Sequence, residues 1–236
     1  MRRSTIRPVR EVVALSLLIG LTAALAPVTQ AQSVSGSAYG ALVRSPGGTQ
    51  RSALAVLPVV TPTDGAAADE DADGLSVPGT ITTDALTGTT SGSIGDAAAA
   101  AQSVATVFNV NLLNGLITAS SLTATVSSTS NGAQATSNAL GSTFGDLAVN
   151  GVQLTSGDGA VAPNTRMALP GVGYVVLNEA LPTGDGVHSS GLTVNLIHVY
   201  LQRLTGGACT LLGCVPGVLM TTGEIIVGSA ASNAAM

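Results

Sequence analysis

Apolar and hydroxyl-bearing residues alternate along much of the chain. Over Leu122–Ser127, leucine, alanine and valine alternate with threonine and serine, which is the period of two of a half-buried strand. The same period runs from Val104 to Val110. An alternative there is a helix capped by Asp96 and continued by the alanines of residues 97–101, but we favour the strand. Further strands are predicted at Gly173–Asn178, Glu224–Val227 and, with apolar residues on both faces as in a central strand, Leu192–Leu204.

Three Asn-Gly pairs mark places where the chain turns back. They are Asn114-Gly115, Asn131-Gly132 and Asn150-Gly151, and Asn-Gly supplies the two positive-φ residues of a type I′ hairpin turn. Many short strands separated by glycine-rich turns predict an all-β chain. We expect an antiparallel β-sandwich or a related hairpin-rich β architecture, with little helix outside the N-terminal segment.

Residues 61–74 interrupt the alternation with a stretch rich in alanine and aspartate. Strand-like sequence lies on both sides, so we expect an acidic loop within one domain that spans residues 32–236. Asp69, Asp71 and Asp73, followed by Gly74, match the first half of a calcium-binding loop. The twelfth position of such a loop should be a bidentate acid, and here it is Thr80. A solvated acidic loop is the favoured interpretation, a weak calcium site is the alternative, and no other cofactor is predicted.

The first 31 residues differ from the rest of the chain. Four arginines are followed by the apolar stretch Val12–Ala26 and by the small residue Ala31, which is the order of a secretory signal peptide that is removed on export. No later apolar run reaches the length of a membrane span. We therefore expect a secreted or extracellular protein with no transmembrane segment in the mature chain and no C-terminal anchor.

Charge is scarce after this leader and is mostly negative. Residues 32–236 contain no lysine, four arginines and twelve acids, a net charge of about −8. A lysine-free acidic surface argues against nucleic acid as a partner. Serine and threonine make up about one residue in five, which is typical of exposed strand faces on extracellular proteins.

Cys209 and Cys214 are the only cysteines in the chain. In an oxidising compartment, this C-x4-C spacing favours a disulfide bond across a short loop. A metal-binding pair is the alternative, although no histidine or third cysteine lies nearby in the sequence.

No set of residues in the sequence forms a recognisable catalytic motif, and we assign no catalytic residue. His188 lies near Asp185, and His198 lies within an apolar strand. Glycoside hydrolysis needs two carboxylates on either side of the scissile bond. Glu179 and Glu224 could supply them, but nothing in their spacing selects that pair.

Taken in order, several segments resemble those of the choice-of-anchor P proteins, a family of exported bacterial surface proteins. The matching segments are Ser37–Gly40, Asn111–Ser128, Val149–Gly151, Ala162–Thr165, Leu169–Gly173, Leu177–Glu179, Leu192–Leu201 and Gly223–Ala230. The resemblance implies an exported protein of a group named for its varied C-terminal anchors, and it carries no established activity or site residue to this chain.

Three functions follow as expectations from the sequence. The favoured one is a non-catalytic secreted or cell-surface β domain with a structural or adhesive role. The first alternative is a module that binds carbohydrate, the cell wall or another extracellular surface component, with or without calcium. Only Tyr39, Tyr174 and Tyr200 are available as an aromatic platform for sugar, which counts against it. The second alternative is a secreted hydrolase.

Overall fold

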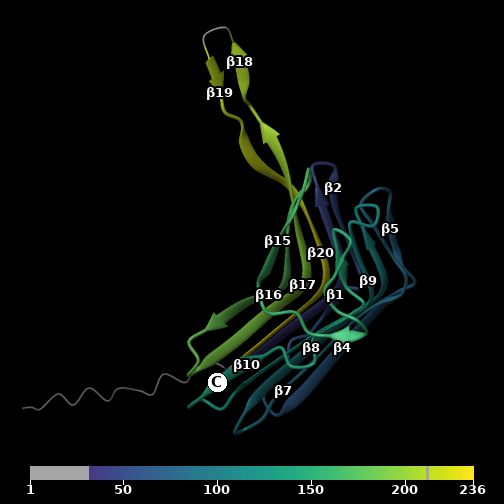
Figure 1. Ribbon diagram of the computed structural model, residues 1–236. Coiled ribbons are helices and arrows are strands. Elements are labelled where there is room, and N and C mark those ends of the chain that lie inside the picture. Colours follow the sequence, from purple (N-terminus) through teal and green to yellow (C-terminus); the bar gives the residue numbers. More distant parts are fainter. Residues whose placement is uncertain (1–31, 211–212) are drawn as a thin grey trace, which may run out of the picture. The chain divides into compact units, whose positions relative to one another are not determined.

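Every regular element of the described chain is an antiparallel strand. A computed structural model describes residues 32–210 and 213–236, with the backbone alone for 208–210 and 213–215. No helix occurs in these ranges, and the strands form two large sheets and one small one (Figure 1). The predicted all-β, sandwich-like class is confirmed. The predicted signal peptide, residues 1–31, lies outside the described residues.

The first sheet, sheet A, has seven strands in the order β15-β16-β17-β20-β1-β2, with β3 also paired to β1. The longest strands, β17 and β20, lie at its centre, where the sequence predicts a strand buried on both faces. The strands of sheet A are β15 (Thr165–Leu169), β16 (Gly173–Gly184), β17 (Ser189–Thr205), β20 (Val218–Ala235), β1 (Ser33–Ser45), β2 (Gly48–Ser52) and β3 (Ala55–Val56).

The second sheet, sheet B, has eleven strands arranged around β8 and β9. These two form a hairpin through Asn114-Gly115, where both residues have positive φ, as the sequence predicts. The strands of sheet B are β4 (Asp64–Ala72), β5 (Leu75–Val77), β6 (Ile81–Thr83), β7 (Leu86–Ile94), β8 (Ala99–Leu112), β9 (Ile117–Ser130), β10 (Ala135–Asn138), β11 (Thr143–Gly145), β12 (Ala148–Val149), β13 (Val152–Gln153) and β14 (Asp158–Gly159).

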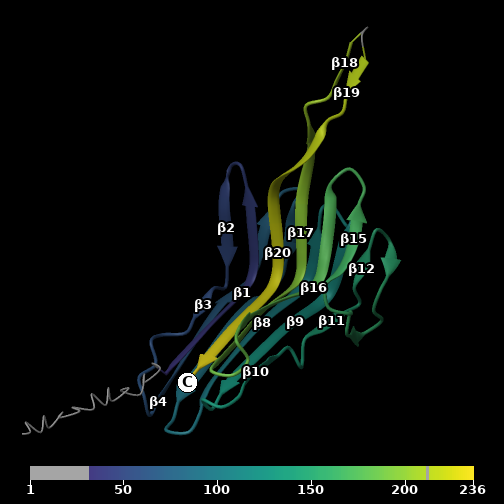
Figure 2. The same cartoon turned by 90° about the vertical axis from the view of Figure 1, so that its left-hand side faces the viewer.

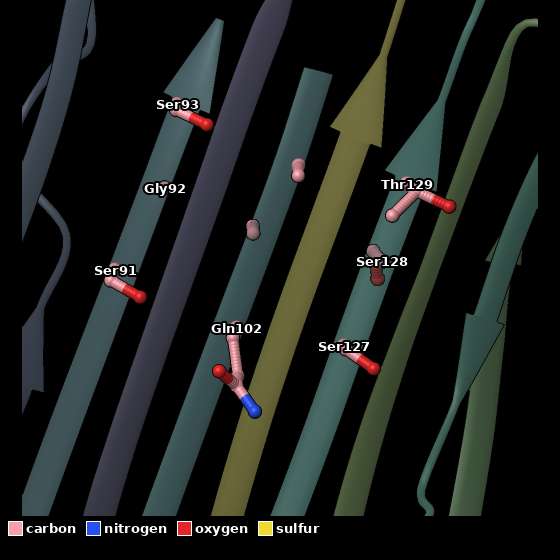
Figure 3. A pocket seen from close by; sticks show the side chains of 9 residues that line it. Ser91, Gly92, Ser93, Gln102, Ser127, Ser128 and Thr129 are labelled. Carbon is pink, nitrogen blue, oxygen red and sulfur yellow. The ribbon is translucent and has the colours of Figure 1, made fainter. Parts of the chain in front are cut away.

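The two sheets pack face to face. Strand β1 lies against β7 and β8, while β20 lies against β8 and β9. In Figure 3, strands of sheet A are visible in the gaps between strands of sheet B and run in nearly the same direction, which is the aligned type of sandwich packing. Aliphatic residues from both sheets and one aromatic residue, Phe144, fill the space between them.

Hydroxyl groups replace aliphatic side chains in one part of this interior. Thr90 and Ser103 of sheet B are hydrogen-bonded to each other, at 2.9 Å between their oxygens, and Ser103 donates to the carbonyl of Ala231 in sheet A. Ser128 of β9 lies 2.7 Å from the hydroxyl of Ser232 in β20. The sandwich is therefore joined by hydrogen bonds as well as by apolar contact.

The inward-facing positions of sheet A shift by one residue along a line across four strands. In β17, Val194 and Leu196 face the core, and then Ile197 and Val199 do so. Strand pairing is interrupted at the same level in β16, β17, β20 and β1. We call the residues at this level the switch row; they are Asn178, Leu196, Gly228 and Gly40. Asn178 and Gly228 have positive φ values of 50° and 66°.

The structure corrects the prediction for residues 61–74. Residues Asp64–Ala72 form strand β4, which pairs along its whole length with β7, so this stretch is not a loop. Alanine and aspartate are poor strand formers, but cross-strand pairing overrides such weak preferences. The strand predicted near Val104–Val110 is confirmed as part of β8, and the helical alternative is wrong.

The central hairpin of sheet A extends beyond its neighbours (Figures 1 and 2). Pairing of β17 with β16 ends at Leu201, whereas β17 continues to pair with β20 as far as Thr205 and Val218. The small sheet of β18 (Ala208–Thr210) and β19 (Gly213–Val215) follows, with Cys209 directly opposite Cys214 in the backbone register. Their side chains lie outside the described residues, so the disulfide stays a prediction.

Candidate functional site

The outer face of sheet A, which is turned away from sheet B, collects the residue types that are scarcest in the sequence. It carries all three tyrosines and three of the four arginines that follow the predicted leader. We call this surface the tyrosine face. It consists of Tyr39, Leu42, Arg44, Arg51, Arg166, Tyr174, Val176, Glu179, Asn195, His198, Tyr200, Glu224, Ile226 and Ser229.

The strand register places these side chains in three neighbouring rows. The middle row runs across six strands from Arg166 at one edge, through His198, to Arg51 at the other. One flanking row contains Tyr174, Tyr200, Glu224 and Arg44, and the other contains Glu179, Asn195, Ser229 and Tyr39. The switch row lies between the middle row and the Glu179 row, and it is the shift there that turns both rows outward.

Glu179 is the most strongly held ionisable group of the tyrosine face. Its carboxylate accepts hydrogen bonds from Asn195 Nδ2 at 2.8 Å and Tyr200 OH at 2.8 Å, and its Oε2 lies 2.7 Å from His198 Nδ1. Burial alone would raise the pKa of Glu179, but the hydrogen bonds from His198, Asn195 and Tyr200 outweigh burial and lower that pKa to about 2. Glu179 is therefore a carboxylate at neutral pH.

His198 contacts both Glu179 and Glu224, the two glutamates that the sequence spacing did not select as a pair. Its Nδ1 faces Glu179, and its Nε2 lies 3.3 Å from Glu224 Oε2. Arg44 Nη1 in turn lies 2.6 Å from Glu224 Oε1. The imidazole thus occupies the space between the two carboxylates, where a glycosidase would hold the bond that it cleaves.

The tyrosine rings stack with cationic side chains and with each other. The rings of Tyr174 and Tyr200 are 4.6 Å apart, and His198 stacks on the other side of Tyr200 at 4.0 Å. The guanidinium of Arg166 lies 3.9 Å above Tyr174, and that of Arg51 lies 5.1 Å from the centre of the Tyr39 ring. Burial raises the pKa of Tyr200, as does its hydrogen bond to Glu179, so its hydroxyl stays protonated and keeps donating.

A hollow of about 330 Å³ lies on the same face of sheet A, next to the row of Glu179 and Tyr39. Ala231, which lies on the central strand β20, contributes only a methyl group to its lining. Hydroxyl and amide groups surround it. Its polar side chains come from Ser35, Ser37, Thr183, Thr193 and Asn233.

A second hollow, of about 440 Å³, lies on sheet B (Figure 3). Ser91, Gln102 and Ser127 come from three adjacent strands and lie side by side in one row of this surface. No charged or aromatic side chain is among its lining residues. This surface offers hydrogen bonds but neither a stacking platform nor a charge.

The predicted calcium ligands are not brought together. Asp69 and Asp71 lie opposite Thr89 and Thr87 on the extended strand β4, and Asp73 follows the end of that strand. Carboxylates two residues apart on a strand are separated by roughly 6.6 Å along the backbone. Within residues 32–207 and 216–236, whose side chains the structure describes, no three His, Asp or Glu side chains form a group that could hold a metal ion.

His188 and Asp185 form a separate contact at the turn between β16 and β17. The side chains lie 3.2 Å apart, and both are about half exposed. Asp185 Oδ1 accepts the backbone N–H groups of Ser189, Val187 and His188, which lowers the pKa of that carboxyl. The aspartate closes the turn, and this explains its role without a ligand.

The cluster of Glu179, His198 and Glu224 was not predictable from spacing, because three strands and their register bring it together. The available signal was compositional. Aromatic, cationic and histidine residues are so few in this chain that a surface on which they gather is a candidate functional site.

Within the described part of the chain, no helix is long and apolar enough to cross a membrane. No protein-family model matches the chain, and comparisons with curated proteins and with solved structures found no match.

Proposed function

We propose that this chain is a non-catalytic adhesive protein of the secreted or cell-surface class, and that it adheres by binding polysaccharide through the tyrosine face. The observation that carries the proposal is the gathering of all three tyrosines and three of the four arginines that follow the leader on one face of one sheet. Chance would distribute so few residues over both sheets and their loops.

Carbohydrate is the ligand class that fits this surface. Sugar rings present apolar C–H faces and hydroxyl edges, so they bind where aromatic rings lie beside hydrogen-bonding side chains. Tyr174 and Tyr200 form a stacked pair whose outer faces are covered by Arg166 and His198, so a sugar contacts the edges of these rings. The hollow beside the tyrosine face is lined by hydroxyls and amides. The three tyrosines that counted against a sugar platform when scattered in the sequence support one when they share a face.

The geometry of the acids supports binding without catalysis. A glycosidase needs one carboxyl with a raised pKa to protonate the leaving group. The pKa of Glu179 is instead lowered to about 2, and Glu224 is paired with Arg44. His198 contacts both carboxylates, so neither has a vacant side toward a substrate between them.

Retention on immobilised polysaccharides tests the proposal. The purified mature chain is passed over columns of cell-wall polysaccharide, and the Tyr174→Ala and Tyr39→Ala variants are compared with it. Burying an aromatic ring against a ligand stabilises the complex enough that each variant should lose at least about tenfold in affinity. Phe108→Ala is the matched control, because Phe108 is an aromatic residue that is 44% exposed on sheet B.

Two results would overturn the proposal. One is the absence of binding to any polysaccharide in the panel. The other is equal loss of binding in the Phe108→Ala control, which would locate the binding surface elsewhere. Release of reducing sugar from a bound polysaccharide would replace the non-catalytic proposal with the hydrolase alternative.

The location of the protein outside the cytoplasm is inferred from its sequence. The N-terminal 31 residues support export, and the resemblance to the choice-of-anchor P proteins supports a bacterial surface or secreted protein. Fractionation of the native culture into medium and cell wall tests the location. Recovery of the protein in the cytoplasm with residues 1–31 still attached would contradict it.

A further inference from the structure

The charges of the described chain are separated between its two sheets. Apart from Glu179 and Glu224, the acids after the leader lie on sheet B and its connections or, in one case, at the turn of Asp185. The tyrosine face carries three arginines against these two glutamates. It is therefore the cationic surface of a chain whose net charge after the leader is about −8.

Two of the three arginines have charges that no carboxylate neutralises. Arg44 is paired with Glu224 at 2.6 Å, whereas no carboxylate lies within salt-bridge distance of Arg51 or Arg166 in the described residues. Both side chains are exposed, and each lies over a tyrosine ring. Stacking fixes the plane of a guanidinium and leaves its N–H edge available for an oxyanion.

The two arginines occupy opposite edges of the sheet in one row. The row runs from Arg166 in β15 across β16, β17, β20 and β1 to Arg51 in β2. Five strand spacings separate its ends, which is roughly 24 Å along the sheet. Between them lie Val176, which is partly exposed, and His198, Ile226 and Leu42, which are buried. The side chains that a polymer can contact here are therefore those of the two arginines and of the tyrosines beneath them.

From this arrangement we infer that the ligand of the tyrosine face is an acidic polysaccharide that lies across the strands, with oxyanions bound by Arg166 at one edge of sheet A and by Arg51 at the other. This inference rests on the proposed function and adds the ligand's charge and direction. The distance between the arginines requires a chain of several sugar units. Carboxylate and phosphate groups share the necessary chemistry, because both accept two parallel hydrogen bonds from a guanidinium.

Binding by charge variants tests the inference. The mature chain is titrated with polygalacturonate, which carries carboxylates, with a poly(glycerol phosphate) polymer, which carries phosphates, and with neutral dextran. Arg51→Gln and Arg166→Gln should each weaken binding of at least one acidic polymer about tenfold or more, and added NaCl should weaken it further. Arg203→Gln is the matched control, because it removes the same charge from the part of β17 that extends beyond the sheet.

The three polymers separate failure of this inference from failure of the proposed function. Loss of acidic-polymer binding in both edge variants, with Arg203→Gln unchanged, supports the inference, and the better-bound acidic polymer identifies the oxyanion. Dextran binding that depends on Tyr174 but on neither arginine leaves the proposed function standing and overturns the inference. An equal effect of Arg203→Gln would also overturn it, since net charge would then explain the binding. Binding of none of the polymers overturns both.

Discussion

At the scale of single residues, Glu179 shows how a nearly buried carboxylate is kept charged. Its side chain is 11% exposed, and burial without partners would favour the neutral acid. Three donors, from His198, Asn195 and Tyr200, reverse that preference. Because Asn195 also accepts from Ser229 Oγ, the contacts extend across β16, β17 and β20 and hold the tyrosine face in one arrangement.

The lowered pKa of Glu179 predicts a loss of stability in acid. Its folded-state value of about 2 lies below the ordinary 4.5, so the contribution is fully present above about pH 4.5 and is lost as the pH falls toward 2. Glu179→Gln should lower the free energy of unfolding at pH 7 by about 2 kcal/mol. In this variant the free energy of unfolding should also fall less steeply between about pH 4.5 and pH 2 than it does in the unchanged protein. Urea unfolding at a series of pH values measures both effects. Glu70→Gln, on the exposed strand β4, is the control and should change neither.

At the scale of elements, close contact between β7 and sheet A depends on Gly88. A Cβ atom at this position would lie 2.9 Å from the carbonyl oxygen of Ala38 and 2.5 Å from that of Ala53. Backbone atoms cannot move aside as a flexible side chain can. Gly88→Ala should therefore destabilise the fold by about 2 kcal/mol or more in denaturant unfolding. In Gly65→Ala the nearest atom would be 3.4 Å away, so this control should be close to neutral, and equal losses would contradict the packing explanation.

Strand β4 gives a clear expectation for calcium. Its aspartates lie along an extended backbone, whereas a calcium loop curls so that its carboxylates converge. Calcium at about 1 mM, where extracellular modules bind it, should leave the melting temperature unchanged relative to the same buffer with chelator. A reproducible rise that disappears in Asp71→Asn would restore the calcium alternative.

The tip of the central hairpin gives a second expectation at this scale. Cys209 and Cys214 are directly opposite in the β18–β19 register, a placement that is compatible with a disulfide between neighbouring strands. Protein exported to an oxidising compartment should lack free thiols and gain two hydrogens in mass on reduction. Rapid labelling of both cysteines without reductant would contradict the disulfide.

Local patterns predicted the elements well, and long-range register explains what they missed. The alternation at Leu122–Ser127 and the Asn114-Gly115 turn identified the β8–β9 hairpin because turn chemistry and period are local properties. Strand β4 was missed because its pairing with β7, rather than its own composition, makes it extended. The contact of Glu179 with Glu224 through His198 depends on the register of β16, β17 and β20, and no short segment of sequence encodes that.

At the scale of the whole molecule, hydroxyl pairs join the two sheets. Ser128 is buried and connects β9 to Ser232 of β20 and to Ser137 of β10. Ser128→Ala should cost about 1–3 kcal/mol of unfolding free energy, because it leaves the buried Ser232 without this partner. The double variant with Ser232→Ala should cost less than the sum of the two single changes. Strict additivity in urea unfolding would show that the hydroxyls do not act as a pair.

The switch row restricts how sequences of this fold can vary in length. On one side of it, sheet A turns one set of alternate positions toward the core, and on the other side it turns the complementary set. An insertion or deletion within any of the four strands would exchange core and surface residues from that point onward. Relatives of this protein should therefore tolerate length changes in the turns, such as those at Asp185 and Gly47. They should keep fixed the spacing between two residues of one strand on either side of the switch row, such as Asn195 and His198 of β17.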